Sequence, residues 1–233
     1  MTQSVHNFSS KDQEAFKTLF LHKLRHDLVN TARPLIEIPK WIEEDIQNDG
    51  LDVPASMQEN LDMLGNYGTR LLCMISDLLT YAHIGQHPET EPAPLSEILS
   101  ATASDILPDG FQLITDLEHN QIGIPKSDTA TLLQALLSNA VKHHDRETGK
   151  IRVTCKKIDQ ATQLTVSDDG PGIELKYIDR IFDPLTTLAS RDQIEGSGMG
   201  LALVRRIAEI NGATAKALSS VGKRGTCIVV WFP

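Results

Sequence analysis

A pair of glycine-rich turns in the last third of the chain constrains the fold most strongly. Asp168-x-Gly170-x-Gly172 follows an alternating strand pattern through Leu164 and Val166, and Gly196-x-Gly198-x-Gly200-Leu201 directly precedes an apolar-periodic helical segment. A carboxylate beside tight glycine turns can accept a hydrogen bond from an exocyclic amine on a flat ring. Bare backbone N–H groups at a helix N-terminus bind phosphate. The two turns together predict a nucleotide pocket.

Two commoner phosphate-binding motifs do not fit these turns. The run Gly196-Ser-Gly-Met-Gly-Leu lacks the spacing of the third glycine in G-x-G-x-x-G. No Lys-Ser or Lys-Thr pair follows it, as a P-loop requires. The sequence therefore disfavours both a dinucleotide-binding fingerprint and a P-loop.

Composition limits the class of protein. A chain of 233 residues is long enough for one large or two small domains, and 40% apolar residues support buried cores. The net charge of −9, with no basic run longer than two residues, disfavours nucleic-acid binding. The three cysteines are too scattered for a disulfide framework or a zinc site. We expect a cytoplasmic location.

Targeting and membrane signals are absent from the sequence as given. The N-terminal residues have neither a basic n-region nor an apolar h-region. No apolar run approaches the roughly 20 residues that span a bilayer. We expect no membrane segment in this chain, and any membrane sensor would belong to another polypeptide or to a part absent here.

The N-terminal part predicts a helical hairpin. Residues Ser9–Asn48 have the periodicity of one long helix, in which Pro34 and Pro39 each favour a kink or a break. Asn48-Asp49-Gly50 is a stop signal, and a second helix is predicted from about Pro54 to Ala82. A lone hairpin cannot bury its apolar stripe. We therefore expect a homodimer built on a four-helix bundle.

The segment Gln86–Pro94 contains three prolines and predicts a linker, which divides the chain into domains 1–88 and 89–233. Beyond it, the pattern predicts helices over 95–106, 129–144 and 200–210, the second capped by Ser127 or Asp128, and strands over 111–117, 151–156, 163–166, 213–219 and 226–231. These elements do not follow a strict βαβ alternation. The predicted fold class is α+β, with the hairpin followed by a two-layer α/β sandwich.

The order and spacing of the glycine-rich turns, with Phe182-Asp183-Pro184 between them, resemble the boxes of the ATP-binding domain of sensor histidine kinases. This is the Bergerat-type fold. The resemblance implies that Asp168 binds the adenine amine, that Gly170 and Gly172 shape the wall, and that Phe182 packs under a lid. It also implies that the turn containing Gly196, Gly198, Gly200 and Leu201 lies at the nucleotide.

Two further positions of the pocket follow from the same resemblance. Arg191, in the polar lid over 186–194, either reaches the γ-phosphate or is solvated. Thr226, in Gly222-Lys-Arg-Gly225-Thr226, matches the last turn of the family pattern with one residue inserted. The resemblance implies an adenine contact for Thr226.

The stretch Asn139-Ala140-x-Lys142-His143 resembles the N-box of the family. The resemblance implies that Asn139 binds Mg²⁺, that Lys142 contacts phosphate, and that His143 lies with them at the nucleotide. Residues three apart share a helical face, and a side-chain carbonyl is a hard oxygen ligand suited to Mg²⁺. Ala135 occupies the position of an earlier asparagine of the pattern. Asn139 therefore does the work of two asparagines, or metal binding is weaker.

The stretch His26-Asp27-x-x-Asn30 resembles the H-box, which implies that His26 is the phosphoacceptor. A neutral imidazole is a good nucleophile, and Asp27 can accept a hydrogen bond from one ring nitrogen and raise the basicity of the other. Asn30 shares the face of His26 and either orients a hydrolytic water or is a plain surface residue. Thr31 occupies the usual proline position, so Pro34 is expected to displace the bend by about a turn.

The resemblance covers nearly the whole chain from about residue 16 and implies the catalytic core of a sensor histidine kinase. ATP with Mg²⁺ would phosphorylate His26, and the phosphoryl group would pass to an aspartate of a response-regulator receiver domain. The signal would come from an upstream sensor domain or protein. Three alternatives stay open: a phosphatase-dominant regulator, a catalytically weak regulatory or phosphotransfer protein, and a serine/threonine kinase of the same ATPase fold. The helical hairpin argues against the last.

Overall fold

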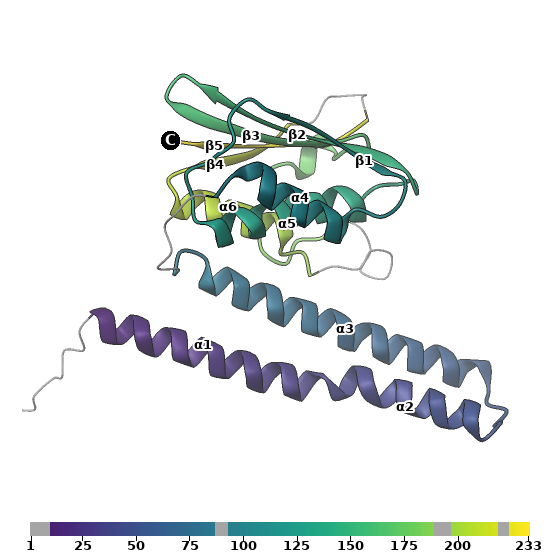
Figure 1. Ribbon diagram of the computed structural model, residues 1–233. Helices are drawn as coiled ribbons and strands as arrows, with labels where there is room; N and C mark the ends of the chain where they lie inside the picture. The colour runs from purple at the N-terminus through teal and green to yellow at the C-terminus, as the bar shows by residue number, and fades with distance from the viewer. Residues whose placement is uncertain (1–9, 87–92, 189–196, 219–223) are drawn as a thin grey trace, which may run out of the picture. The chain divides into compact units, whose positions relative to one another are not determined.

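The computed structural model describes residues 10–86, 93–188, 197–218 and 224–233, with side chains in the first helix from residue 19 onward (Figure 1). It contains two compact units, Met1–His83 and Ile84–Pro233. Most of the predicted linker, and the boundary predicted between 88 and 89, lie outside the described residues. The first unit is helical and the second is a mixed α/β unit, as the predicted fold class requires.

The helical unit contains α1 (Ser10–Ala32), α2 (Pro34–Asn48) and α3 (Ala55–His83). The break predicted at Pro34 is confirmed, because the helical stretch is divided at Arg33 into α1 and α2. Pro34 has no N–H, so it cannot donate the next backbone hydrogen bond of α1. The Arg33 carbonyl accepts hydrogen bonds from the amides of Ile36 and Glu37 at 3.0 and 3.1 Å, and these bonds begin α2. Pro39 lies buried inside α2 without ending it. The bend is therefore displaced beyond Thr31, as expected.

Helix α3 packs closely on α2 at one glycine. A Cβ atom on Gly68 would lie 3.0 Å from the backbone carbon of Leu35 and from a side-chain carbon of Ile36. Gly65, one turn earlier, faces open space. The predicted stop is confirmed, since α2 ends at Asn48 and Gly50 has φ +62°. The absence of a side chain at Gly68 thus lets the two helices approach beside the break.

One side of α3 carries an exposed apolar seam. Its positions alternate by three and four residues, which is the heptad period of a packed helix pair. Five of its large apolar side chains are exposed, with between 40% and 54% of their surface accessible to solvent. The seam consists of Met57, Asn60, Leu64, Tyr67, Leu71, Met74, Leu78 and Tyr81. The helices α1 and α2 add exposed Leu28, Leu35, Ile38 and Trp41. The helical unit therefore leaves much of its apolar surface uncovered.

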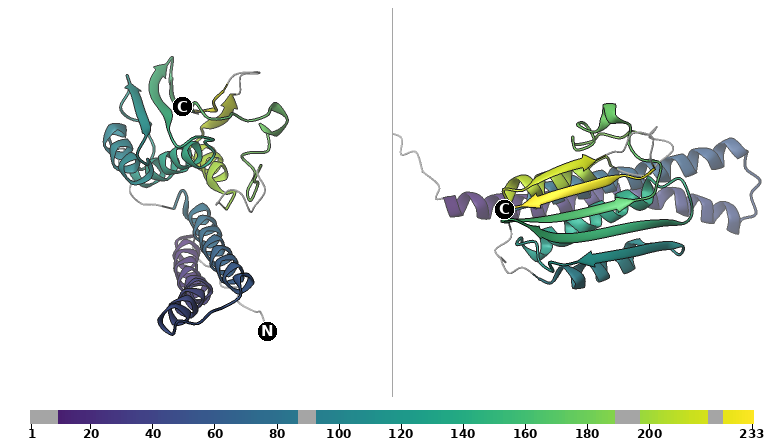
Figure 2. Two further views of the ribbon diagram at one scale, coloured as in Figure 1. Left: turned by 90° about the vertical axis from the view of Figure 1, so that its right-hand side faces the viewer. Right: turned by 90° about the horizontal axis from the view of Figure 1, so that it is seen from above.

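The α/β unit is a five-stranded sheet of order β1-β2-β3-β5-β4, with three helices on one face (Figures 1 and 2). Strand β1 pairs parallel with β2, and the remaining pairs are antiparallel. The strands are β1 (Phe111–Leu117), β2 (Gly149–Ile158), β3 (Ala161–Asp168), β4 (Thr214–Leu218) and β5 (Cys227–Phe232); the helices are α4 (Leu95–Ile106), α5 (Lys126–Lys142) and α6 (Gly200–Ile210). The two-layer sandwich is confirmed.

The core of this unit lies between the sheet and its helices. Alternate residues of β2 and β3, such as Val153 and Leu164, are fully buried, which is the period-two pattern of a sheet with one covered face. Leu132, Leu133 and Leu137 of α5 are also fully buried. Burial raises the pKa of the Cys155 thiol to about 11, so this cysteine is a packing residue. The sandwich thus closes its core within one copy of the chain.

The start of α5 differs from the prediction. The helix begins at Lys126, after Pro125, and no side chain caps it. The predicted capping by Ser127 or Asp128 is wrong, because both residues already lie in the first turn, where Asp128 is buried. The Pro125 carbonyl accepts from the Thr129 amide at 2.9 Å and from its hydroxyl at 3.0 Å. Proline is favoured beside a helix start because its fixed φ suits the first turn.

Across the described ranges, none of the helices combines the length and the apolar character needed to span a lipid bilayer.

Candidate active site

Asp168 lies at the end of β3, and one of its carboxylate oxygens accepts two backbone hydrogen bonds. Its Oδ1 atom accepts from the backbone amides of Gly170 at 2.9 Å and Thr226 at 3.1 Å. The Asp168 amide in turn donates to the Thr226 carbonyl at 3.0 Å. Burial raises the pKa of the Asp168 carboxyl, partly offset by these two amide bonds. Neither bond uses Oδ2, which is therefore the atom that can accept from a ligand amine.

Two glycines let the turns of the pocket meet backbone to backbone. Gly225 has φ +100°, and a Cβ atom there would collide with the carbonyl oxygen of Asp168. Its amide donates to the Gly170 carbonyl at 2.8 Å. A Cβ on Gly172, at φ +83°, would lie 3.1 Å from the Gly225 carbonyl oxygen. The extra residue in the last turn therefore leaves the Gly225-Thr226 pair in contact with Asp168.

The C-terminal end of α5 carries the three residues predicted from the N-box stretch. Asn139 is half-buried, Lys142 is the last helical residue, and His143 follows as the C-cap. Desolvation and then the Lys142 charge lower the pKa of His143, while the Asp168 carboxylate acts to raise it. Lys142, His143 and Asp168 are thus near enough to interact electrostatically.

The donor set at Asn139 suits a hard cation that takes its other ligands from elsewhere. Within the described residues, no group of three or more histidine, cysteine or acidic side chains is arranged to hold a metal ion. An ion at Asn139 would therefore be completed by water and phosphate oxygens, as Mg²⁺ commonly is. Lys142, three residues on, lies on the same helical face for the phosphate charge.

Phe182 is buried under a guanidinium that the sequence did not single out. The Arg205 guanidinium of α6 lies 5.3 Å from the Phe182 ring centroid, and its Nη1 donates to Asp183 Oδ1 at 2.8 Å. A Cβ on Gly198, at φ +71°, would lie 2.8 Å from the Thr186 carbonyl oxygen. Arg205 and Gly198 thus contact the segment at Asp183 and Thr186, where the predicted lid begins. Arg191 and Gly196 lie outside the described residues.

The second glycine turn ends at the N-terminus of α6. Gly200 begins the helix, and the buried Ser197 hydroxyl accepts from the Met199 amide at 3.1 Å. The side chain of Leu201 is buried in the core. Leu201 can therefore contribute only its backbone to a ligand, together with the other free amides of the first turn.

His26 lies exposed on α1 beside two polar side chains of the same helix. Its Nδ1 atom is 3.2 Å from Asp27 Oδ1, and the Asn30 Nδ2 atom is 3.0 Å from His26 Nε2. A carboxylate only accepts, so the contact with Asp27 favours the tautomer that carries its proton on Nδ1. The same Asn30 Nδ2 atom also lies 3.3 Å from Nδ1, so the amide is close to both ring nitrogens. The His26 side chain is 70% exposed, so a donor or a partner protein can reach it.

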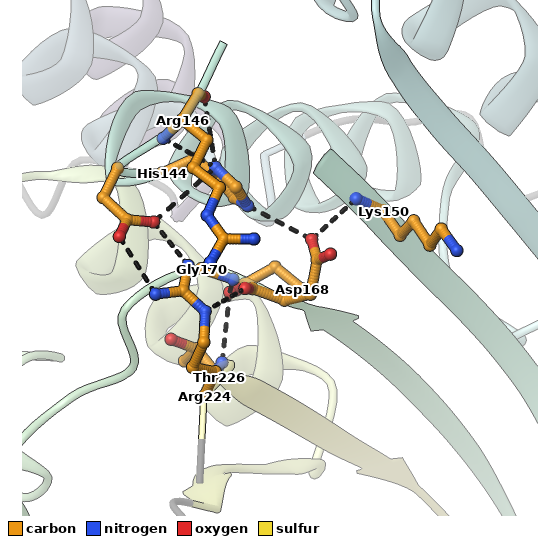
Figure 3. Close-up of polar contacts among 9 residues, drawn as sticks. His144, Arg146, Lys150, Asp168, Gly170, Arg224 and Thr226 are labelled. Atoms are coloured by element: carbon orange, nitrogen blue, oxygen red, sulfur yellow. Dashed lines mark hydrogen bonds and ion pairs between the residues drawn. The ribbon is translucent and has the colours of Figure 1, made fainter. Parts of the chain in front are cut away.

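A polar network behind Asp168 joins three segments and was missed by sequence reasoning (Figure 3). Arg224 pairs with Asp145, and His144 pairs with Asp169. The partners are 79 and 25 residues apart, so no local period reveals them. The one available sequence signal was Arg224 itself, which lies in the turn that carries the extra residue.

Comparison with known proteins relates the C-terminal part of the chain to an ATPase family. Residues 126–233 match the family of histidine kinase-, DNA gyrase B-, and HSP90-like ATPases. Cyanobacterial phytochrome A of Nostoc sp. is 25% identical over 97% of this chain and 29% of its own length. The probable sensor histidine kinase HK of Mycobacterium tuberculosis is 30% identical over 64% of this chain and 40% of its own.

A solved structure shares the architecture. The crystal structure of full-length ShkA in complex with AMPPNP has a TM-score of 0.63 at 21% identity, covering 91% of this chain and 45% of that protein. The chain spans less than half the length of both curated relatives. By these sequence matches the chain resembles the catalytic core of sensor histidine kinases, and the solved structure shows that it shares their fold.

Proposed function

We infer from these resemblances and from the pocket that the chain binds ATP with Mg²⁺ and phosphorylates His26. The phosphoryl group then passes to an aspartate of a response-regulator receiver domain. The observation that carries the proposal is the Asp168 carboxylate, whose Oδ1 is held by two backbone amides while Oδ2 stays available for an amine. Such a fixed acceptor at the end of a strand suits the recognition of adenine.

The residues around Asp168 divide the nucleotide between them. Gly170 and Gly172 form the wall beside the base, and the Thr226 backbone fixes the carboxylate. Lys142 and the first turn of α6 supply positive potential for the phosphates. Asn139 would hold the Mg²⁺ ion, which neutralises phosphate charge when bound. Arg191 is proposed to reach the γ-phosphate from the lid.

The nucleophile is the Nε2 atom of His26. Asp27 holds the proton on Nδ1, which keeps the Nε2 lone pair free for attack and stabilises the imidazolium that develops. The Nε2–P bond forms as the bond between phosphorus and the leaving oxygen of ADP breaks. The Asn30 amide must turn away from Nε2 before this step. Positioning and charge neutralisation carry most of the catalysis.

The active form is proposed to be a homodimer. The seam on α3 follows a heptad pattern, and its exposed leucines would become buried against a second copy. Because His26 and the nucleotide pocket belong to different units, transfer requires the two units to come together in the catalytic state. An upstream sensor would act on this equilibrium. ATP and receiver domains are cytoplasmic, which is where we propose that the protein acts.

The test is incubation with γ-labelled ATP and Mg²⁺, followed by acid and alkali treatment. We expect acid-labile, alkali-stable label on the wild type and none on His26→Gln or Asn139→Ala. His22→Gln is the matched control, because His22 is exposed one turn earlier on the same helix. Label that survives in His26→Gln would refute the assignment of His26 as the phosphoacceptor. A wild-type protein that binds ATP but takes up no label would refute the proposed kinase activity.

A phosphatase activity is the second candidate, and the position of Asn30 favours it. Its amide lies at the nitrogen that carries phosphate in the kinase reaction, so it is placed to orient a water against an incoming acyl phosphate. Asn30→Ala should keep autophosphorylation and slow the loss of phosphate from the phosphorylated receiver domain. Unchanged phosphate loss in this variant would leave Asn30 without this role.

A further inference from the structure

Arg224 ties the last turn of the pocket to the segment that follows α5. Its Nη1 and Nη2 atoms donate to the two oxygens of Asp145 at 3.0 and 2.6 Å, and its Nε donates to the Asp169 carbonyl at 3.2 Å. The Arg224 hydrogen bonds lower the pKa of Asp145 to about 2. The carboxylate is therefore charged throughout the physiological pH range. The two-pronged geometry restricts both position and orientation.

His144 makes the second link, from the opposite side of Asp169. Its Nε2 atom lies 3.1 Å from Asp169 Oδ1, and its side chain is only 1% exposed. The ring occupies a slot made by two glycines, since a Cβ on Gly149 or Gly170 would lie 2.8 or 3.2 Å from ring atoms. The same Asp169 oxygen accepts from the Lys150 amide at 2.7 Å. Asp169 is thus fixed at both its side chain and its carbonyl.

These links hold the neighbours of the residues that orient Asp168. Asp169 follows Asp168 directly, and Arg224 lies two residues before Thr226. The Thr226 amide fixes Oδ1 of Asp168, which leaves Oδ2 facing a ligand. If the turn at Arg224 shifts, this amide moves and the carboxylate is free to rotate. The orientation of the Asp168 carboxylate therefore depends on a contact outside the pocket.

We propose that Arg224, through its paired contact with Asp145, is a positioning residue that sets the preference of the pocket for an adenine amine. This inference rests on the proposed ATP-binding function. Both side chains of the pair are 42% exposed, and exposed ion pairs add little to global stability. The effect is therefore on the geometry of Asp168 rather than on folding.

The experiment compares binding of ATP and inosine triphosphate, which carries a carbonyl oxygen in place of the adenine amine. The whole chain is used, with Mg²⁺, as wild type, Arg224→Ala, Asp145→Ala, the double variant and the swap Arg224→Asp/Asp145→Arg. Lys176→Ala is the matched control, because it removes another exposed ion pair, with Glu174 at 2.7 Å. Thermal unfolding of each variant is measured in parallel.

We expect Arg224→Ala to weaken ATP binding about fivefold, the size of one impaired hydrogen bond, while binding of inosine triphosphate changes little. Asp145→Ala should match it, the double variant should add nothing, and the swap should recover part of the preference. Lys176→Ala should behave as wild type. Arg224→Lys, which keeps the charge and loses the two-pronged contact, should show an intermediate preference and serves if the alanine variant does not fold.

The results that overturn the proposal are distinguishable. An unchanged ratio of the two affinities in a folded Arg224→Ala or Arg224→Lys protein, or an equal loss of both nucleotides, removes the positioning role and leaves the ATP-binding function intact. A wild type that binds ATP without preferring it to inosine triphosphate also overturns this inference alone, whereas a wild type that does not bind ATP removes the proposed function and this inference with it.

Discussion

The two units differ in whether one copy of the chain completes them. The α/β unit buries the apolar residues on the helix-covered face of its sheet and the leucines of α5, and its pocket is assembled from its own turns. The helical unit exposes a regular apolar seam along α3 and further large side chains on α1 and α2. The proposed nucleotide pocket thus belongs to a unit that closes its own core, whereas the proposed phosphoacceptor lies on a unit that we propose is completed by a second copy.

The largest effect is expected from charges in the seam. Leu64→Glu combined with Leu71→Glu places carboxylates in the proposed interface, which should weaken dimerisation by about 3 kcal/mol or more per dimer. Sedimentation should then show a monomer that still binds ATP. Cys73→Glu puts the same charge on an exposed position of α3, two residues from Leu71 and so on nearly the opposite face, and should stay dimeric. A dimeric double variant would contradict the incompleteness of the helical unit.

Next in size is a substitution where two turns of the pocket meet. Gly225→Ala should destabilise the α/β unit by about 3 kcal/mol or more and abolish ATP binding, because its methyl group would collide with the Asp168 backbone. Gly123→Ala is the control, since Gly123 also has positive φ, +74°, but faces open space. It should cost only about 1 kcal/mol. Equal losses in denaturant unfolding would mean that the backbone contact is unimportant.

A smaller effect should separate two glycines of α3. Gly65→Ala should stabilise the helical unit by about 0.5–1 kcal/mol, because alanine favours a helix and the site is open. Gly68→Ala should instead destabilise it by about 1 kcal/mol, because its methyl group crowds Leu35 and Ile36. Thermal unfolding at matched protein concentration measures both. A stabilised Gly68→Ala protein would show that the contact between α2 and α3 has room for a methyl group.

The smallest effect is a pH dependence confined to the α/β unit. Asp168 must be ionised to accept from the adenine amine, and burial raises its pKa. ATP affinity should therefore fall on acidification at a higher pH than an ordinary aspartate would give. For stability the sign is opposite: ionising this buried carboxyl opposes folding, so protonation as the pH falls relieves that cost. Asp168→Asn should bind weakly at every pH, and calorimetric titration between mildly acidic and neutral pH tests this.

Regular elements were predictable because their signal is local. The alternation that ends at Asp168 marked β3, and the apolar period after Gly200 gave the bounds of α6 as observed. The start of α5 was mispredicted because aspartate is a residue type that commonly caps helices, whereas Asp128 is buried within the first turn. The site contacts of Arg224 and Arg205 depend on partners far away in the chain, which no local pattern specifies. The roles assigned to His26, Asn139 and Asp168 remain predictions.

The break at Arg33 has a mechanical consequence for His26, the proposed phosphoacceptor. Arg33 lies seven residues beyond His26, so an uninterrupted stretch of α1, about 10 Å long at 1.5 Å per residue, separates the imidazole from the pivot. A change of about 10° in the angle at that pivot moves the ring by about 2 Å at the end of such an arm. His26 and Asn30 move together in such a rotation, because both lie on α1 on the same side of the pivot. A small change of angle at the break can thus shift the proposed nucleophile by about half the reach of a hydrogen bond while its contact with Asn30 stays intact.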